Sequence, residues 1–128
     1  HRWLLERTGG RFFDSVGFGR RVLLLTTTGR KSGEARTTPL VFMPHGDSYV
    51  VYASNGGQER PPAWWLNLQA NSNAEVQVRG RRVPVHAAVA TDAEHGTIWP
   101  EARRYNDHWR QYAENTKRTI PLVLLRPR

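Results

Sequence analysis

Short runs of apolar and β-branched residues, each closed by a turn containing glycine or proline, most strongly restrict how this chain folds. Runs of this length suit strands, and turns at this spacing favour an antiparallel barrel over a parallel α/β sheet. We predict about six strands, over residues 21–28, 36–43, 49–54, 75–79, 82–90 and 120–126.

Two helical regions are predicted between these strands. A proline pair precedes residues 63–70, and proline suits the first turn of a helix. Thr91 and Glu94 have the capping-box spacing, which opens a longer helical region before the last strand. Pro100 is expected to kink that region or to start a second helical segment.

The chain is expected to form one domain, because 128 residues can close a single modest core. We assign residues 21–128 to the barrel. Residues 1–20 are interpreted as an N-terminal arm or the remainder of a truncated helix, since the chain begins at His1 rather than Met. The predicted fold class is mainly β (α+β), with about six antiparallel strands and two to three helices.

A net charge of +8 implies an acidic partner, which could be nucleic acid, an anionic membrane surface or a polyanionic small molecule. Lysine occurs only at Lys31 and Lys117, so nearly all of the positive charge is arginine. The planar guanidinium suits two-point contacts to phosphate and carboxylate groups. The arginines are spread along the chain, so a local anion pocket and a nucleic-acid face both remain open from charge alone.

The chain has no cysteine, which excludes disulfides and thiolate metal sites and suits a reducing cytoplasm. The histidines His45, His86, His95 and His108 do not have the spacing of metal ligands, so no metal site is predicted. No apolar run approaches the length needed to cross a bilayer.

Three segments are candidates for the chemistry. The turn 29–33, with Arg36, offers glycines, cations and a hydroxyl that could hold a phosphate, although local sequence alone favours a solvated hairpin turn. The helix start near Ala63 would offer free N–H groups to an anion, with Trp64 or Trp65 beside a planar ring. One of these tryptophans is expected to pack in the core.

An aromatic stripe in the late helical region is the third candidate. Ile98, Ala102, Tyr105, Trp109 and Tyr112 recur at three- and four-residue steps, which places them on one helical face. Such a face either packs in the core or forms a lid over a flat substrate, and the sequence favours neither.

Several blocks in order resemble a known family. They are 24–33 (LLTTTGRKSG), 36–40 (RTTPL), 53–57 (ASNGG), 63–71 (AWWLNLQAN) and 118–121 (RTIP). The chain resembles the deazaflavin-dependent nitroreductase family of actinobacteria, whose cofactor is the 8-hydroxy-5-deazaflavin coenzyme F420. The likeness covers roughly residues 21–127, and the combination of blocks is more specific than any one of them.

The resemblance implies a split β-barrel related to folds that bind flavin mononucleotide (FMN). It also implies hydride transfer from the reduced deazaflavin to an enone, quinone or nitro compound.

The resemblance places Arg30, Lys31 and Ser32 at the phosphate or acidic tail of the cofactor. Beside its ring and ribityl chain it places Arg36, Thr37, Thr38, Pro39, Leu40 and Val41. On the phosphate side it places Tyr52, Ala53, Ser54 and Asn55, and it completes the pocket with Ala63, Trp64, Trp65, Leu66 and Asn67. Trp109 and Tyr112 are implied at the acceptor, where Tyr112 or solvent would deliver a proton.

The chain departs from the family pattern at Asn55, where relatives commonly have lysine, and Arg60 is expected to compensate for that lost charge. Val41 and Trp109 stand where aromatic and tyrosine residues are frequent, which reshapes the acceptor pocket.

Two other functions stay open: an FMN-dependent oxidoreductase on the same barrel, and a non-catalytic module that binds a cofactor or other anion. Nucleic-acid binding is not expected, because no recognised motif accompanies the charge. We expect a cytoplasmic protein with a small-molecule acceptor, and leave open a homodimer and peripheral membrane contact through residues missing from the N-terminus.

Overall fold

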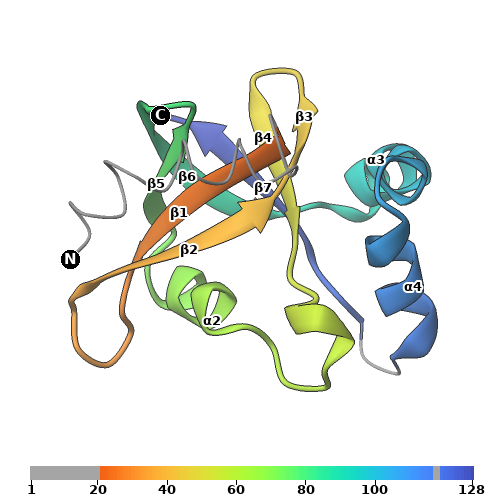
Figure 1. Ribbon diagram of the computed structural model, residues 1–128, viewed down its shortest axis with the longest axis horizontal. Helices are drawn as coiled ribbons and strands as arrows, with labels where there is room; N and C mark the ends of the chain where they lie inside the picture. Colours follow the sequence, from red (N-terminus) through yellow and green to blue (C-terminus); the bar gives the residue numbers. More distant parts are fainter. Residues whose placement is uncertain (1–20, 117–118) are drawn as a thin grey trace.

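A single antiparallel sheet forms the frame of the molecule in the computed structural model, which describes residues 21–116 and 119–128 (Figure 1). Its strand order is β2-β1-β5-β6-β7-β4-β3. The strands are β1 (Val22–Thr28), β2 (Ala35–Val41), β3 (Met43–His45), β4 (Ser48–Tyr52), β5 (Asn73–Val78), β6 (Arg81–Val89) and β7 (Leu122–Pro127). The sheet curls into a split β-barrel, as expected, and the predicted N-terminal arm 1–20 lies outside the described residues.

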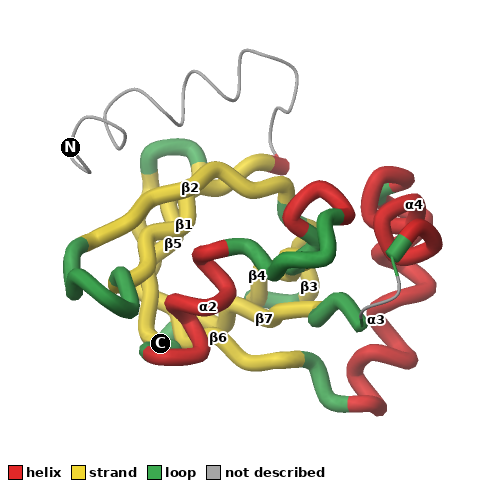
Figure 2. Tube along the Cα trace, turned by 90° about the horizontal axis from the view of Figure 1, so that it is seen from below, coloured by secondary structure: helices red, strands yellow, loops and turns green. Residues whose placement is uncertain are grey.

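Three α-helices and one 3-10 turn connect the strands. They are η2 (Asn55–Gly57), α2 (Ala63–Ala70), α3 (Asp92–Tyr105) and α4 (Asp107–Asn115). Seen from below in Figure 2, α2 lies across the open side of the curled sheet, apart from α3 and α4. Among the described helices, none is both long enough and apolar enough to cross a bilayer.

The described residues form seven strands rather than about six, because the predicted strand 36–43 is divided at Phe42. The Phe42 amide donates to the carbonyl of Arg21 at 2.8 Å, and the next residue, Met43, pairs instead with Val50 of β4. The chain therefore leaves β1 at this corner and joins the other edge of the sheet. Strands β3 and β4 are then joined by a turn of two residues, Gly46 and Asp47.

The helix break after α3 also differs from the prediction. Pro100 lies inside α3, and the break falls at Asn106. The Asn106 side chain accepts hydrogen bonds from the amides of His108 and Trp109 at 2.9 and 3.3 Å, so it caps α4. The predicted capping box at Thr91 and Glu94 is confirmed at the start of α3.

The central strands are buried on both faces, which produces two hydrophobic clusters. In β7, Val123 and Leu125 pack in the first cluster, with α2, whereas Leu122 and Leu124 pack in the second, with α3 and α4. This alternation follows from the two-residue period of a strand. Strand β7 thus links the α2 side of the molecule to the α3–α4 side.

Candidate cofactor site

An open cavity of about 590 Å³ lies between the β1–β2 turn, β2, η2 and the start of α2. This volume is within the range usual for cofactor sites. It joins the two sequence segments that were expected to grip an anion, the glycine-bounded turn and the start of the tryptophan helix. The described residues that line the cavity are Thr27, Gly29, Arg30, Lys31, Ser32, Arg36, Thr37, Thr38, Leu40, Tyr52, Ser54, Asn55, Gly56, Pro62, Ala63, Trp64 and Asn67.

The β1–β2 turn is closed by its own backbone. The Gly33 amide donates to the Gly29 carbonyl and the Gly29 amide donates to the Glu34 carbonyl, both at 2.8 Å. A Cβ atom at Gly29 would lie 2.8 Å from Ser32 Oγ and 3.1 Å from the Glu34 carbonyl, so glycine is required there. Gly33 has a φ of +74°, which favours glycine for a different reason.

The side chain of Asn67 ties this turn to α2. Its Oδ1 atom accepts hydrogen bonds from the Arg30 amide at 3.1 Å and from Arg30 Nη1 at 3.2 Å. Its Nδ2 atom donates to Thr27 Oγ1 at 3.1 Å. Asn67 and Thr27 are only 4% and 2% exposed, so the bond between them is shielded from water, whereas the bonds from the exposed Arg30 are partly buried. A buried amide therefore sets how far the cationic turn stands from the helix.

The far wall of the cavity is shaped by η2. Asn55 and Gly56 adopt positive φ values of 49° and 66°. The Asn55 side chain donates to the Arg60 carbonyl at 2.9 Å, which folds the 55–60 loop back on itself. Pro62 precedes α2 without a side-chain cap, so the helix start, with its unpaired amides and positive dipole end, lies at the wall formed by Ala63 and Trp64.

Electrostatically, the cavity suits an anion at one end. Arg30, Lys31 and Arg36 line it, and none of the described lining residues is acidic. Glu34 is close by and pairs with Arg36 at 3.3 Å, but both side chains are more than half exposed, so this ion pair neutralises the arginine weakly. Ser32 Oγ holds the same guanidinium at 3.4 Å.

Most of the residues implied at the cofactor line the cavity, and five do not. Those five are Pro39, Val41, Ala53, Trp65 and Leu66. Ala53 and Trp65 are buried in the first cluster, and Val41 packs against the second. Four lining residues were not among the predicted set: Thr27, Gly29, Gly56 and Pro62. The glycines lie in the quoted blocks and Pro62 in the proline pair before the helix, whereas Thr27 lies in the block 24–33 but was not singled out as a site residue.

Trp109 and Tyr112 do not line the cavity. Trp109 is 5% exposed and packs in the second cluster, so the core interpretation fits it. Tyr112 is half buried beside the same cluster and stacks on His108, with ring centroids 6.2 Å apart. Trp109 does contact a lining residue: its ring centroid lies 5.8 Å from that of Tyr52. A role for Trp109 and Tyr112 at the acceptor stays a prediction.

A split barrel with a cationic cavity of this size suits a protein that binds an anionic flavin or deazaflavin cofactor. The comparisons identify the family within that class. The profile of the F420H(2)-dependent quinone reductase family matches residues 1–127, and the chain belongs to this family. It is an F420-dependent reductase, and its cofactor is coenzyme F420.

Individual relatives agree with this assignment. An F420H(2)-dependent quinone reductase of Mycobacterium tuberculosis is 34% identical over 128 residues, which is 98% of this chain and 86% of that protein. A solved F420-H2 dependent reductase (FDR-A) is 32% identical with a TM-score of 0.75, over 83% of this chain and 94% of that one. A second structure, described as a domain-swapped dimer, is 29% identical with a TM-score of 0.76, over 97% of each chain.

Proposed function

We propose that this chain holds reduced F420 in the cavity between the β1–β2 turn and α2 and transfers its hydride to a quinone. The observation that carries the proposal is the Asn67 side chain, which binds the cationic turn to the helix so that both face one cavity. The family description and the M. tuberculosis relative support a quinone as the acceptor.

The cavity has the polarity that this cofactor needs. Coenzyme F420 carries a phosphodiester and an oligoglutamate tail, which suit the guanidinium and ammonium groups of Arg30, Lys31 and Arg36. Continuing along β2, Thr37 and Thr38 offer hydroxyls, and Leu40 offers an apolar surface. The charge of the lining therefore falls from the turn toward Leu40, and we place the tail at the turn and the ring at the far end.

The cofactor supplies a carbon-bound hydride, and the protein supplies position and shielding. Trp64, 8% exposed, and Leu40 would cover the ring against water while the cationic turn holds the tail. Fixing the tail at several points reduces the freedom of the ring, which favours a productive distance to the acceptor. The remaining implied contacts, at Ser32, Ser54, Asn55 and Ala63, belong to the same proposal.

The test is a titration of the purified chain with F420, followed by oxidation of the reduced cofactor with a water-soluble naphthoquinone. We expect binding that weakens as salt rises, because the tail contacts are ionic, and turnover with the quinone. Binding of FMN without F420 would support the flavin alternative. F420 binding with no oxidation across quinones, enones and nitro compounds would support a non-catalytic module.

A further inference from the structure

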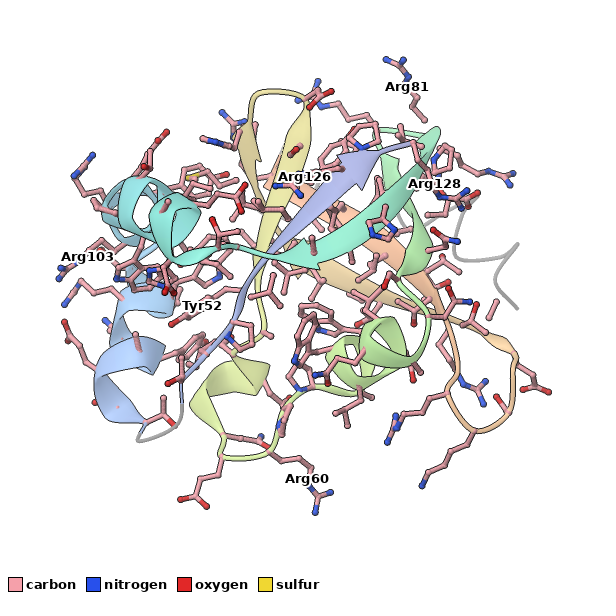
Figure 3. All side chains as sticks on the ribbon, turned by 180° about the vertical axis from the view of Figure 1, so that it is seen from behind. Tyr52, Arg60, Arg81, Arg103, Arg126 and Arg128 are labelled. Atoms are coloured by element: carbon pink, nitrogen blue, oxygen red, sulfur yellow. The ribbon has the colours of Figure 1, made fainter. Side chains whose placement is uncertain are left out.

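Tyr52 lines the cavity and also contacts aromatic side chains of α3 and α4. It ends β4, is 7% exposed and contributes to the cavity lining. Trp64, from α2, is the other aromatic residue in the described lining. Figure 3 shows Tyr52 on the side of the sheet where α3 and α4 lie.

Two tryptophans hold the Tyr52 ring in place. Trp99 of α3 stacks on it, with centroids 5.0 Å apart and planes 28° from parallel. Trp109 of α4 lies 5.8 Å away at 43°. Tyr105 supports Trp109 at 6.2 Å and donates from its hydroxyl to the Phe42 carbonyl at 2.8 Å, which ties the group to the sheet corner. The orientation of Tyr52 is therefore set by both late helices.

The resemblance implies Tyr52 on the phosphate side of the cofactor, whereas its packing favours the end of the cavity away from the cations. Tyr52 is the last residue of β4, and Val41 is the last residue of β2. Both residues belong to the second cluster or pack against it. Val41 is five residues beyond Arg36 in β2, which corresponds to roughly 17 Å along an antiparallel strand. The aromatic wall and the cationic turn therefore mark opposite ends of the cavity.

We propose that Tyr52 selects the acceptor by offering its ring to a planar quinone at this end of the cavity, with Trp99 and Trp109 as positioning residues. The inference rests on the proposed function and assigns its acceptor contact to β4 rather than to Trp109 and Tyr112 of α4. Offset or edge-to-face packing of two rings at 4.5–7 Å adds to the free energy of simple burial, and a planar acceptor can use this packing fully.

The test compares Tyr52→Leu and Tyr52→Phe with the wild type. Tyr49→Leu is the matched control, because Tyr49 is on the same strand but packs against Phe42 at 5.5 Å outside the cavity. The binding of a naphthoquinone to protein saturated with oxidised F420 is measured by calorimetry, and KM and kcat are measured with reduced F420. Circular dichroism establishes that each variant is folded, and Tyr52→Met replaces Tyr52→Leu if the latter fails to fold.

We expect Tyr52→Leu to weaken quinone binding and to raise KM by roughly 2- to 12-fold, the range for loss of one ring pair. Tyr52→Phe, which keeps the ring, should stay close to the wild type, and in Tyr52→Leu the loss of quinone affinity should exceed any rise in the Kd for F420. Trp99→Leu should raise KM for the naphthoquinone while leaving KM for a small non-planar enone unchanged, a difference that general destabilisation would not produce.

Unchanged quinone affinity in Tyr52→Leu, or a parallel rise in the Kd for F420, would overturn the inference. A wild type that binds quinone without turning it over would instead overturn the proposed function. The binding measurement would still decide the role of Tyr52 in that case. A wild type that binds no quinone at this site would overturn the inference directly.

Discussion

Replacing Asn67 with alanine separates the cationic turn from α2 and is expected to lower both stability and cofactor affinity. The substitution removes three hydrogen bonds, two accepted from Arg30 and one donated to Thr27. At about 1 kcal/mol for each bond, the free energy of unfolding should fall by about 3 kcal/mol. Thr27 is only 2% exposed, so its hydroxyl would be left without this partner inside the protein, which adds to the loss of stability.

The affinity for F420 should fall for the same reason. Two of the three bonds hold Arg30, so about 2 kcal/mol of preorganisation of the turn is lost, which corresponds to a Kd for F420 about 30-fold higher. Urea denaturation measures the stability, and a fluorescence titration with F420 measures the affinity. Gln69→Ala, at an exposed position of the same helix, is the control and should leave both values unchanged.

Asn67→Asp separates the two effects. The carboxylate can still accept from Arg30, now as an ion pair, but it cannot donate to Thr27, so stability should fall by less than in Asn67→Ala. Its negative charge would face an anionic cofactor, so the Kd for F420 should rise by more than in Asn67→Ala. The reasoning fails if Asn67→Ala retains wild-type stability and affinity, or if Asn67→Asp binds F420 as tightly as the wild type.

Three further perturbations test other parts of the molecule. Lys31→Ala should raise the Kd for F420 and flatten its salt dependence, because Lys31 lines the cationic end; an unchanged Kd in a titration at several salt concentrations would make the turn a solvated hairpin. Gly29→Ala should lower the melting temperature, since the new Cβ would lie 2.8 Å from Ser32 Oγ; calorimetry showing a wild-type transition would contradict the need for glycine. The amide of Thr91, hydrogen-bonded to the Glu94 carboxylate, lowers the pKa of Glu94 below its ordinary 4.5. Its stabilising effect is therefore complete above pH 4.5 and is lost as the pH falls through the lower folded pKa, so Glu94→Gln should reduce the acid sensitivity of unfolding measured by circular dichroism.

The parts of the fold that depend on short-range signals could be predicted from the sequence. Helix α2 spans the predicted residues, because a proline pair precedes it and its termination is local. The capping box that starts α3 is equally local. The division of 36–43 into β2 and β3 was missed because it depends on the Phe42 amide, which bonds to Arg21 across the sheet. No local residue preference distinguishes that corner from a continuous strand.

In the site, too, the parts that depend on contiguous sequence could be predicted and those that depend on distant contacts could not. The turn 29–33 and the helix start are contiguous motifs, so their residues could be grouped in advance, and the cavity joins them. Thr27 was missed because its hydroxyl matters only through Asn67, 40 residues further along the chain. The stripe containing Trp109 was left open between core and lid on one helical face. Its residues pack in or against the second cluster, but they are divided between α3 and α4 at Asn106, a break that the amphipathic pattern does not reveal.

The two ends of the cavity are built from different kinds of contact, so substitutions can test the proposed cofactor contacts and the proposed acceptor contact separately. The cationic end depends on one turn, closed by its own backbone and held by one buried amide. The apolar end is formed where β4 alternates between the two clusters, so that Tyr52 lines the cavity and also packs on Trp99 and Trp109. Substitutions in α3 and α4 are therefore expected to alter the proposed acceptor end through Tyr52 without moving the turn, because no described hydrogen bond joins these helices to residues 29–33.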